Sequence, residues 1–120
     1  MRILDIVDYS QPAKETLEWE PKPEAVISGK PSQAAHMHFT SPCGQLSTGI
    51  WESECGQWTV NFTENEYCEI LEGVSVLRDS EGTEKTVRAG DRFLIPAGVK
   101  GTWEVVERCR KVFVSVEFKG

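Results

Sequence analysis

Glu66 and Cys68 form the first candidate in this sequence for chemistry shared between two side chains. They lie two residues apart in a segment rich in strand-forming residues, and a strand directs alternate side chains to the same face. A carboxylate and a thiol on one face can hydrogen-bond a small ligand. A divalent metal needs more, because several nitrogen, sulfur or oxygen ligands must converge on one point. Glu66 alone does not supply such a site.

His36 and His38 are the only two histidines, and their His-x-His spacing would direct both rings to one face of a strand. Such a pair suits metal chelation. Both lie well before Glu66 in the chain, where they could face the mouth of a pocket, the solvent or a partner subunit. We favour a surface or interface position, and the alternative hypothesis is a metal site formed by Glu66, His36 and His38.

Short strands must position these side chains. From Leu46 onward, runs rich in Val, Ile, Phe, Trp and Thr are separated by Gly, Asp, Ser or Asn clusters, which is typical of an all-β sandwich or barrel. The predicted strands are Ala35 to Phe39, Leu46 to Glu52, Gln57 to Thr63, Tyr67 to Leu71, Val74 to Arg78, Lys85 to Arg88, Arg92 to Ile95, Thr102 to Val106 and Lys111 to Phe118. In the last of these, Val112, Val114, Val116 and Phe118 share one face, which we expect to be the packed one.

The first part of the chain has a different composition. Five of the six prolines fall within the first 42 residues, so residues 1–33 are predicted to form an irregular, Pro-rich arm that packs on the barrel or on a partner. A short helix around Lys14 to Trp19 is an alternative for part of this arm. Residues 34–120 are predicted to form a single barrel domain.

The composition limits the partners that this protein is expected to have. Its 120 residues are enough for one domain with a core. Thirteen basic and nineteen acidic residues give a net charge of -6, which disfavours nucleic acid and membrane surfaces as partners. Asp5 and Asp8 interrupt any apolar run at the N-terminus, and the four cysteines lack Cys-x-x-Cys spacing and are expected to be free thiols. We therefore expect a cytoplasmic protein.

Two motifs in this chain resemble those of the cupin superfamily. Gly90, Pro96 and Gly98 match the second cupin motif in register, and there they turn the chain into and out of a strand. The same register places Gly101 where the family has a metal-binding histidine, and Val105 where it has an asparagine.

Glu66 and Gly73 match the end of the first cupin motif. Anchored on Glu66, the His-x-His pair of the family would fall at Val60 and Phe62, or one residue earlier with the longer spacing, and neither register contains a histidine. The resemblance implies an all-β cupin fold, a jelly-roll barrel or double-stranded β-helix, in which the usual histidine ligands are missing.

From Leu46 to the C-terminus, the chain is more specifically similar to small single-domain cupins related to the cupin domain of (S)-ureidoglycine aminohydrolase. The matching stretches are Gly49-Ile50-Trp51-Glu52, Gly56-Gln57-Trp58, Glu66-Tyr67-Cys68, Ile70-Leu71-Glu72-Gly73, Gly98 to Gly101, Thr102-Trp103-Glu104 and Arg110-Lys111. In that subfamily the named enzyme binds manganese and hydrolyses a small ureido compound, whereas many single-domain members have lost the standard histidines.

The resemblance implies a pocket inside the barrel that is lined by Trp58, Glu66, Cys68, Trp103 and Lys111. The first hypothesis is a small polar or anionic metabolite bound there without the standard metal, with Glu66 and Lys111 as the polar contacts. The alternative is a hydrolase or isomerase of a small ureido or amino compound that uses a divalent metal such as Mn, Zn, Fe or Ni. On composition alone, an exposed edge charge is slightly favoured for Lys111 and core or rim packing for Trp58 and Trp103, whereas Glu66 is equally a structural carboxylate. The resemblance also implies a homodimer.

Overall fold

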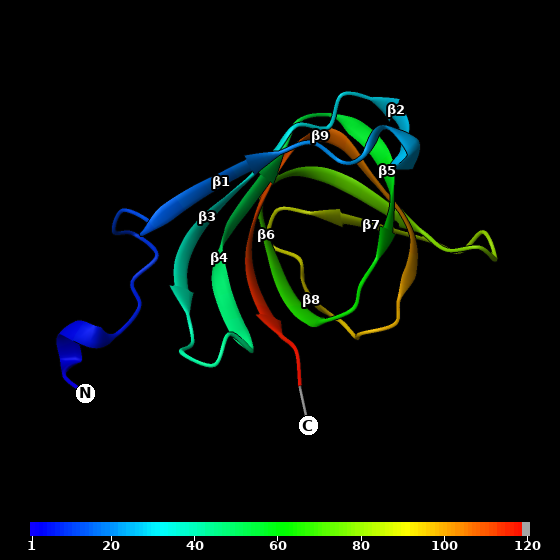
Figure 1. The fold of residues 1–120 in the computed structure, drawn as a ribbon. Helices are drawn as coiled ribbons and strands as arrows, with labels where there is room; N and C mark the ends of the chain where they lie inside the picture. Colours follow the sequence, from blue (N-terminus) through cyan, green and yellow to red (C-terminus); the bar gives the residue numbers. More distant parts are fainter. Residues whose placement is uncertain (119–120) are drawn as a thin grey trace.

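One antiparallel β-sheet curls on itself to form the protein, as the computed structural model of residues 1–118 shows (Figure 1). Its elements are the 3-10 helices η1 (Ile3–Asp5) and η2 (Pro23–Ala25) and the strands β1 (Glu15–Trp19), β2 (Val26–Gly29), β3 (Gln33–Thr40), β4 (Leu46–Ser53), β5 (Gly56–Asn61), β6 (Asn65–Arg78), β7 (Glu84–Arg88), β8 (Arg92–Ile95) and β9 (Lys100–Val116). No α-helix occurs in the described residues, so the predicted all-β class is confirmed. None of the helices in residues 1–118 is long and apolar enough to span a membrane.

The two longest strands, β6 and β9, form the centre of the curled sheet. β9 pairs with β5 through its first half and with β4 through its second half, and β6 pairs with β9 on one side and with β8 and β7 on the other. Four separate strands were expected here, and that expectation is wrong. Register shifts between Ile70 and Ser75 bend the strand pair without ending it. Gly73 permits the bend, because its φ is +88° and a Cβ there would lie 2.1 Å from the carbonyl oxygen of Arg108.

The Pro-rich part of the chain adds a strand to each end of the main strand order. β1 pairs with β3, and β2 pairs with β5. Figure 1 shows β1, β3 and β4 side by side, extending away from the curl that β5 to β9 form. The short helix considered around Lys14 to Trp19 is wrong, since this segment forms β1. Its backbone groups find partners along β3, from Glu15 opposite Met37 to Trp19 opposite Gln33, which a helix this short would leave largely unpaired.

The inward face of β9 is the opposite of the expected one. Lys111, Phe113 and Ser115 are buried, whereas the three valines that alternate with them lie on the outer face and are half-buried. Phe118, which was expected on the valine face, lies beyond the end of the strand and is exposed. Alternation predicts that a strand has two faces, but it does not say which one points inward. The barrel turns its polar face inward here, and that face contributes to the candidate site.

Candidate functional site

A cavity of about 240 Å³ inside the barrel is lined by side chains from six strands, β1, β3, β4, β5, β6 and β9, and by Phe62. Trp51 comes from β4, Trp58 from β5, Glu66 from β6, and Trp103 and Lys111 from β9. Trp58 lies opposite Trp103 in the sheet, and Trp51 lies opposite Lys111. Residues paired across strands share a face, so the curl of the sheet brings all of them into the interior.

Four of the five residues expected to form the pocket therefore line one cavity, namely Trp58, Glu66, Trp103 and Lys111. The fifth, Cys68, does not line it. Cys68 is fully buried and contacts both Glu66 and Lys111 through its sulfur. It thus belongs to the polar cluster next to the cavity and not to the cavity wall.

The polar centre of the site is an ion pair between Lys111 and Glu66. Lys111 Nζ donates to Glu66 Oε2 at 2.7 Å, and the two side chains are only 6% and 17% exposed. Cys68 Sγ donates to the same carboxylate oxygen at 3.1 Å, and Ser115 Oγ donates to Oε1 at 3.2 Å. The carboxylate thus has partners on both oxygens, which a buried charge requires.

These contacts fix the protonation states of the cluster. Burial acts to raise the pKa of Glu66, but the charge of Lys111 and the hydrogen bonds outweigh it, so the pKa lies below its ordinary value. Burial acts to lower the pKa of Lys111, and Glu66 and Cys68 reverse this, so that pKa is raised. Burial, together with the charge of Glu66, raises the pKa of Cys68 to about 12. At neutral pH the site therefore holds a carboxylate, an ammonium and a neutral thiol.

This charge state limits the chemistry that the cluster can perform. A protonated lysine is not an amine nucleophile, and a thiol with a raised pKa is not a thiolate nucleophile. The cluster can donate hydrogen bonds through Lys111 and accept them through Glu66. Recognition of a ligand is therefore better supported by these groups than covalent catalysis.

Two indole rings flank the ammonium group. Lys111 Nζ lies 4.8 Å from the ring centroid of Trp51 and 4.4 Å from that of Trp103, both within cation–π range. The two rings meet edge to face, with centroids 5.6 Å apart, and Trp51 Nε1 donates to Gln33 Oε1 at 2.9 Å. Trp51 was not among the predicted site residues. The stretch Gly49-Ile50-Trp51-Glu52 was noted as part of a motif, but sequence alone did not show which of its side chains points inward.

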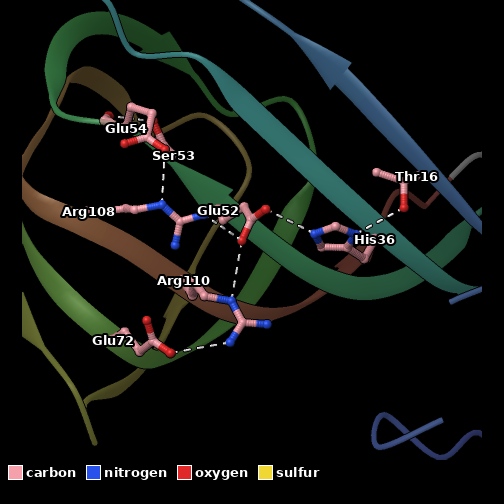
Figure 2. Close-up of polar contacts among 8 residues, drawn as sticks. All are labelled: Thr16, His36, Glu52, Ser53, Glu54, Glu72, Arg108 and Arg110. Atoms are coloured by element: carbon pink, nitrogen blue, oxygen red, sulfur yellow. Dashed lines mark hydrogen bonds and ion pairs between the residues drawn. The ribbon is translucent and has the colours of Figure 1, made fainter. Parts of the chain in front are cut away.

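The two histidines do not join Glu66. His36 lies within hydrogen-bond distance of Thr16, at 3.0 Å, and of Glu52, at 3.1 Å (Figure 2). Figure 2 also shows the ion pairs of Glu52 Oε2 with Arg108 and Arg110, at 3.1 and 3.4 Å. Burial acts to raise the pKa of Glu52, but His36 and Arg108 outweigh it and the net shift is downward.

His38 packs against Tyr9 of the N-terminal segment, with ring centroids 5.2 Å apart. Neither imidazole is a partner of Glu66, so the hypothesis of a metal site made by Glu66, His36 and His38 does not fit the observed geometry. Among residues 1–118, no group of three or more His, Cys, Asp or Glu side chains is arranged to hold a metal ion.

The residues in the barrel do not fit the metal that the cupin resemblance implies. Glu66 is the one carboxylate of the cluster, and the ammonium group of Lys111 already occupies one of its oxygens. A cation placed there would meet the positive charge of Lys111. Gly101, at the position of the absent histidine, packs so closely that a Cβ would lie 1.9 Å from the carbonyl oxygen of Arg78. The close approach of β6 and β9 thus leaves no room for a ligand side chain at that position.

Comparisons with known proteins agree with this barrel. A family model for the EutQ-like cupin domain matches residues 40–113, more than half of the chain. The EutQ protein of Clostridium difficile has a similar structure, with a TM-score of 0.64 and 20% identity over 72% of this chain and 69% of that one. Among curated proteins, none is significantly similar to this chain.

Two proteins of the DUF861 family are also similar. One, of unknown function, from Pseudomonas syringae pv. tomato, has a TM-score of 0.76 and 23% identity, and the match covers 85% of this chain but only 44% of that one. The other, from Thermotoga maritima, is 33% identical, with a TM-score of 0.52, over 53% of this chain and 73% of that one. The predicted cupin fold is thus confirmed, and the chain belongs to the EutQ-like cupin domain family.

Proposed function

We propose that this protein binds a small polar or anionic metabolite in the cavity beside Lys111 and Glu66, without a histidine-held metal. The observation that carries the proposal is the ionised pair between these residues in an aromatic-lined cavity. A buried ion pair costs several kcal/mol per ion to desolvate, so it is weak evidence for a purely stabilising role. Recognition of a ligand is a functional reason for a protein to keep such a costly pair.

The chemistry of the lining defines the class of ligand. Lys111 offers hydrogen-bond donors and a positive charge, Glu66 offers an acceptor, and the indole rings offer flat apolar surfaces. The cavity of about 240 Å³ is small beside the roughly 300–1,000 Å³ of sites for drug-sized ligands. We therefore propose a compact molecule with a carboxylate, amide or ureido group. Ureido compounds belong to this set because of the sequence resemblance to the cupin domain of (S)-ureidoglycine aminohydrolase.

A thermal-shift screen of small carboxylates, amides and ureido compounds tests the proposal. A ligand that binds only the folded protein raises the melting temperature with concentration. The shift should disappear in the Glu66→Ala variant and persist in Glu107→Gln, a control that neutralises an exposed carboxylate on β9, the strand that carries Lys111. A screen in which no compound shifts the wild-type protein would count against the binding function.

A metal-dependent hydrolase of ureido or amino compounds remains the alternative of another class. No feature of the cavity favours it, since Lys111 holds the one carboxylate of the polar cluster. Elemental analysis of protein purified without an affinity tag separates the two. Stoichiometric Mn, Zn, Fe or Ni would favour the hydrolase.

We also propose a homodimer that forms through the outer valine patch, Val112, Val114 and Val116. These side chains are half-buried in the single chain, and Tyr67 lies beside Val114 on the same outward face. In the next row of the sheet, Glu69 lies opposite Arg92. A two-fold axis through this region can set each acid against the base of a second copy. A cytoplasmic location, supported by four free cysteines in the described residues, is part of the same proposal.

A further inference from the structure

A second cavity of about 240 Å³ lies next to the first, between the β6–β7 turn, strand β8 and the start of β9. Its wall is mainly apolar and includes Leu77, Phe93 and Ile95. Val60 and Phe62 line both cavities and are the only residues that the two linings share. The two cavities are therefore adjacent, and Val60 and Phe62 lie at the boundary between the second cavity and the one beside the Lys111–Glu66 pair.

Five charged side chains also line this second cavity, and four of them are exposed, which puts them at its mouth. The bases are Arg78, Lys85 and Lys100, and the acids are Asp79 and Glu84. This is a local excess of base in a chain whose net charge is -6. The position of the two lysines at an apolar opening suits a ligand with an apolar body and a negative head.

The two acids at the mouth already have partners. Glu84 pairs with Arg78, which also binds Glu104 at 2.7 Å. Asp79 Oδ1 accepts hydrogen bonds from the backbone N–H groups of Glu81 and Thr83, at 2.9 and 3.1 Å. Both carboxylates at the mouth are therefore bound by groups of the protein itself.

Lys85 and Lys100 differ from Arg78, because neither forms an ion pair with a carboxylate of residues 1–118. Both are exposed and line the cavity. Their ammonium groups are therefore available to an anion at the opening.

From this arrangement we infer that the second cavity binds a short aliphatic monocarboxylate, with its chain against Leu77, Phe93 and Ile95 and its carboxylate at Lys85 and Lys100. Burial of the chain supplies most of the affinity, at about 0.8 kcal/mol for each CH₂ group removed from water. The two exposed lysines mainly set the preference for a negative head, because solvent weakens surface ion pairs. This inference does not depend on the function proposed for the first cavity.

Octanoate, octanol and octylamine are suitable probes, since they share a chain and differ in head group. Isothermal titration calorimetry at neutral pH should show octanoate binding best and octylamine worst. Chemical shifts of backbone amides should change around Leu77, Phe93 and Val99. Equal binding of octanol and octanoate would overturn the assignment of the head group, and no binding of octanoate would overturn the site.

Charge-reversal variants locate the head group. Lys100→Glu and Lys85→Glu should each weaken octanoate binding by about three- to tenfold, corresponding to about 1 kcal/mol. Lys22→Glu, an exposed position at η2, makes the same charge change away from the cavity and should leave the affinity unchanged. Equal weakening in all three variants would show a general effect of charge and would contradict the inference.

Glu66→Gln distinguishes the two cavities. Octanoate affinity should stay the same in this variant, whereas binding at the first cavity should change. Loss of octanoate binding in Glu66→Gln, with retention in Lys100→Glu, would place the carboxylate in the first cavity and overturn the inference.

Discussion

Lys111 Nζ lies 2.7 Å from Glu66 Oε2 inside the barrel, and the rings of Trp51 and Trp103 flank the same ammonium group. The pair joins the second half of β9 to the start of β6. It places a fixed positive and a fixed negative charge at the wall of a cavity that is otherwise largely aromatic. The stability of the barrel and its response to acid should therefore depend on this pair.

Removal of one member of the pair should destabilise the fold more than removal of both. Lys111→Met leaves Glu66 as a buried carboxylate without its counter-ion, and we expect a loss of about 3 kcal/mol in the free energy of unfolding. The double variant Lys111→Met/Glu66→Gln should recover much of that loss. Urea unfolding followed by circular dichroism measures both. Additive effects of the two substitutions would contradict the coupling, and Glu107→Gln, at an exposed position of β9, serves as the surface control.

The contribution of Glu66 to stability should disappear in acid. Burial acts to raise its pKa, but Lys111 and the hydrogen bonds hold it below the ordinary 4.5 in the folded protein. The unfolded state therefore binds the proton more readily, and this stabilisation, present at neutral pH, is lost as the pH falls through the folded-state pKa. The stability difference between the wild type and Glu66→Gln should shrink below about pH 4. A difference that stays constant from neutral to acidic pH in urea titrations would argue against the lowered pKa.

The sequence allowed the inner face of one strand to be predicted well and that of another poorly. Strand alternation put Glu66 and Cys68 on one face, and the family resemblance brought Lys111 and Trp103 to them. Alternation also placed the valines of β9 and Lys111 on opposite faces of the strand. Because the valine face is the more apolar one, it was expected to be buried, but the structure buries the face with Lys111. A barrel that buries an ion pair departs from the rule that links apolar residues to the interior, and this departure lies at the candidate site.

Other features could be recognised only from the pairing of strands in the structure. The bend at Gly73 looks like a turn in the sequence, yet the strand continues through it because β9 bends with it. The partners of His36 come from β1 and β4, and spacing along β3 does not reveal them. The arm, residues 1–33, was predicted to be irregular, but Glu15–Trp19 pairs with β3 and forms an edge strand of the sheet. The boundary placed at residue 33 stays a prediction.

A histidine introduced at position 101, where the cupin family has a metal ligand, should destabilise the protein and should not create a metal site. In Gly101→His the new Cβ would lie 1.9 Å from the carbonyl oxygen of Arg78, so β6 and β9 would have to separate. We expect a loss of about 3 kcal/mol or more, which is large for a single overpacking substitution. Gly101→Ala should be similarly damaging, because the clash begins at Cβ. A folded Gly101→His protein that binds nickel or manganese in equilibrium dialysis would contradict this account of the site.

The oligomeric state should depend on the outer valine patch. The chain has a mass of 13.5 kDa. For the wild type, we expect light scattering coupled to size-exclusion chromatography to give twice that mass. Val114→Asp puts a charge in the centre of the patch and should give a monomer that remains folded, because position 114 is only half-buried. Leu17→Asp, on the exposed edge strand β1, is the control for an exposed apolar residue elsewhere. A wild-type monomer, or a Val114→Asp dimer, would rule out this interface.

Calorimetric titration of the compound that gives the largest thermal shift tests the binding function most directly. The wild type and Glu107→Gln should bind it with equal affinity and one site per chain. The folded, charge-neutral variant Lys111→Met/Glu66→Gln should bind it at least tenfold more weakly, a loss of about 1.4 kcal/mol. Equal affinity in the wild type and the double variant would show that the Lys111–Glu66 pair does not form the ligand site.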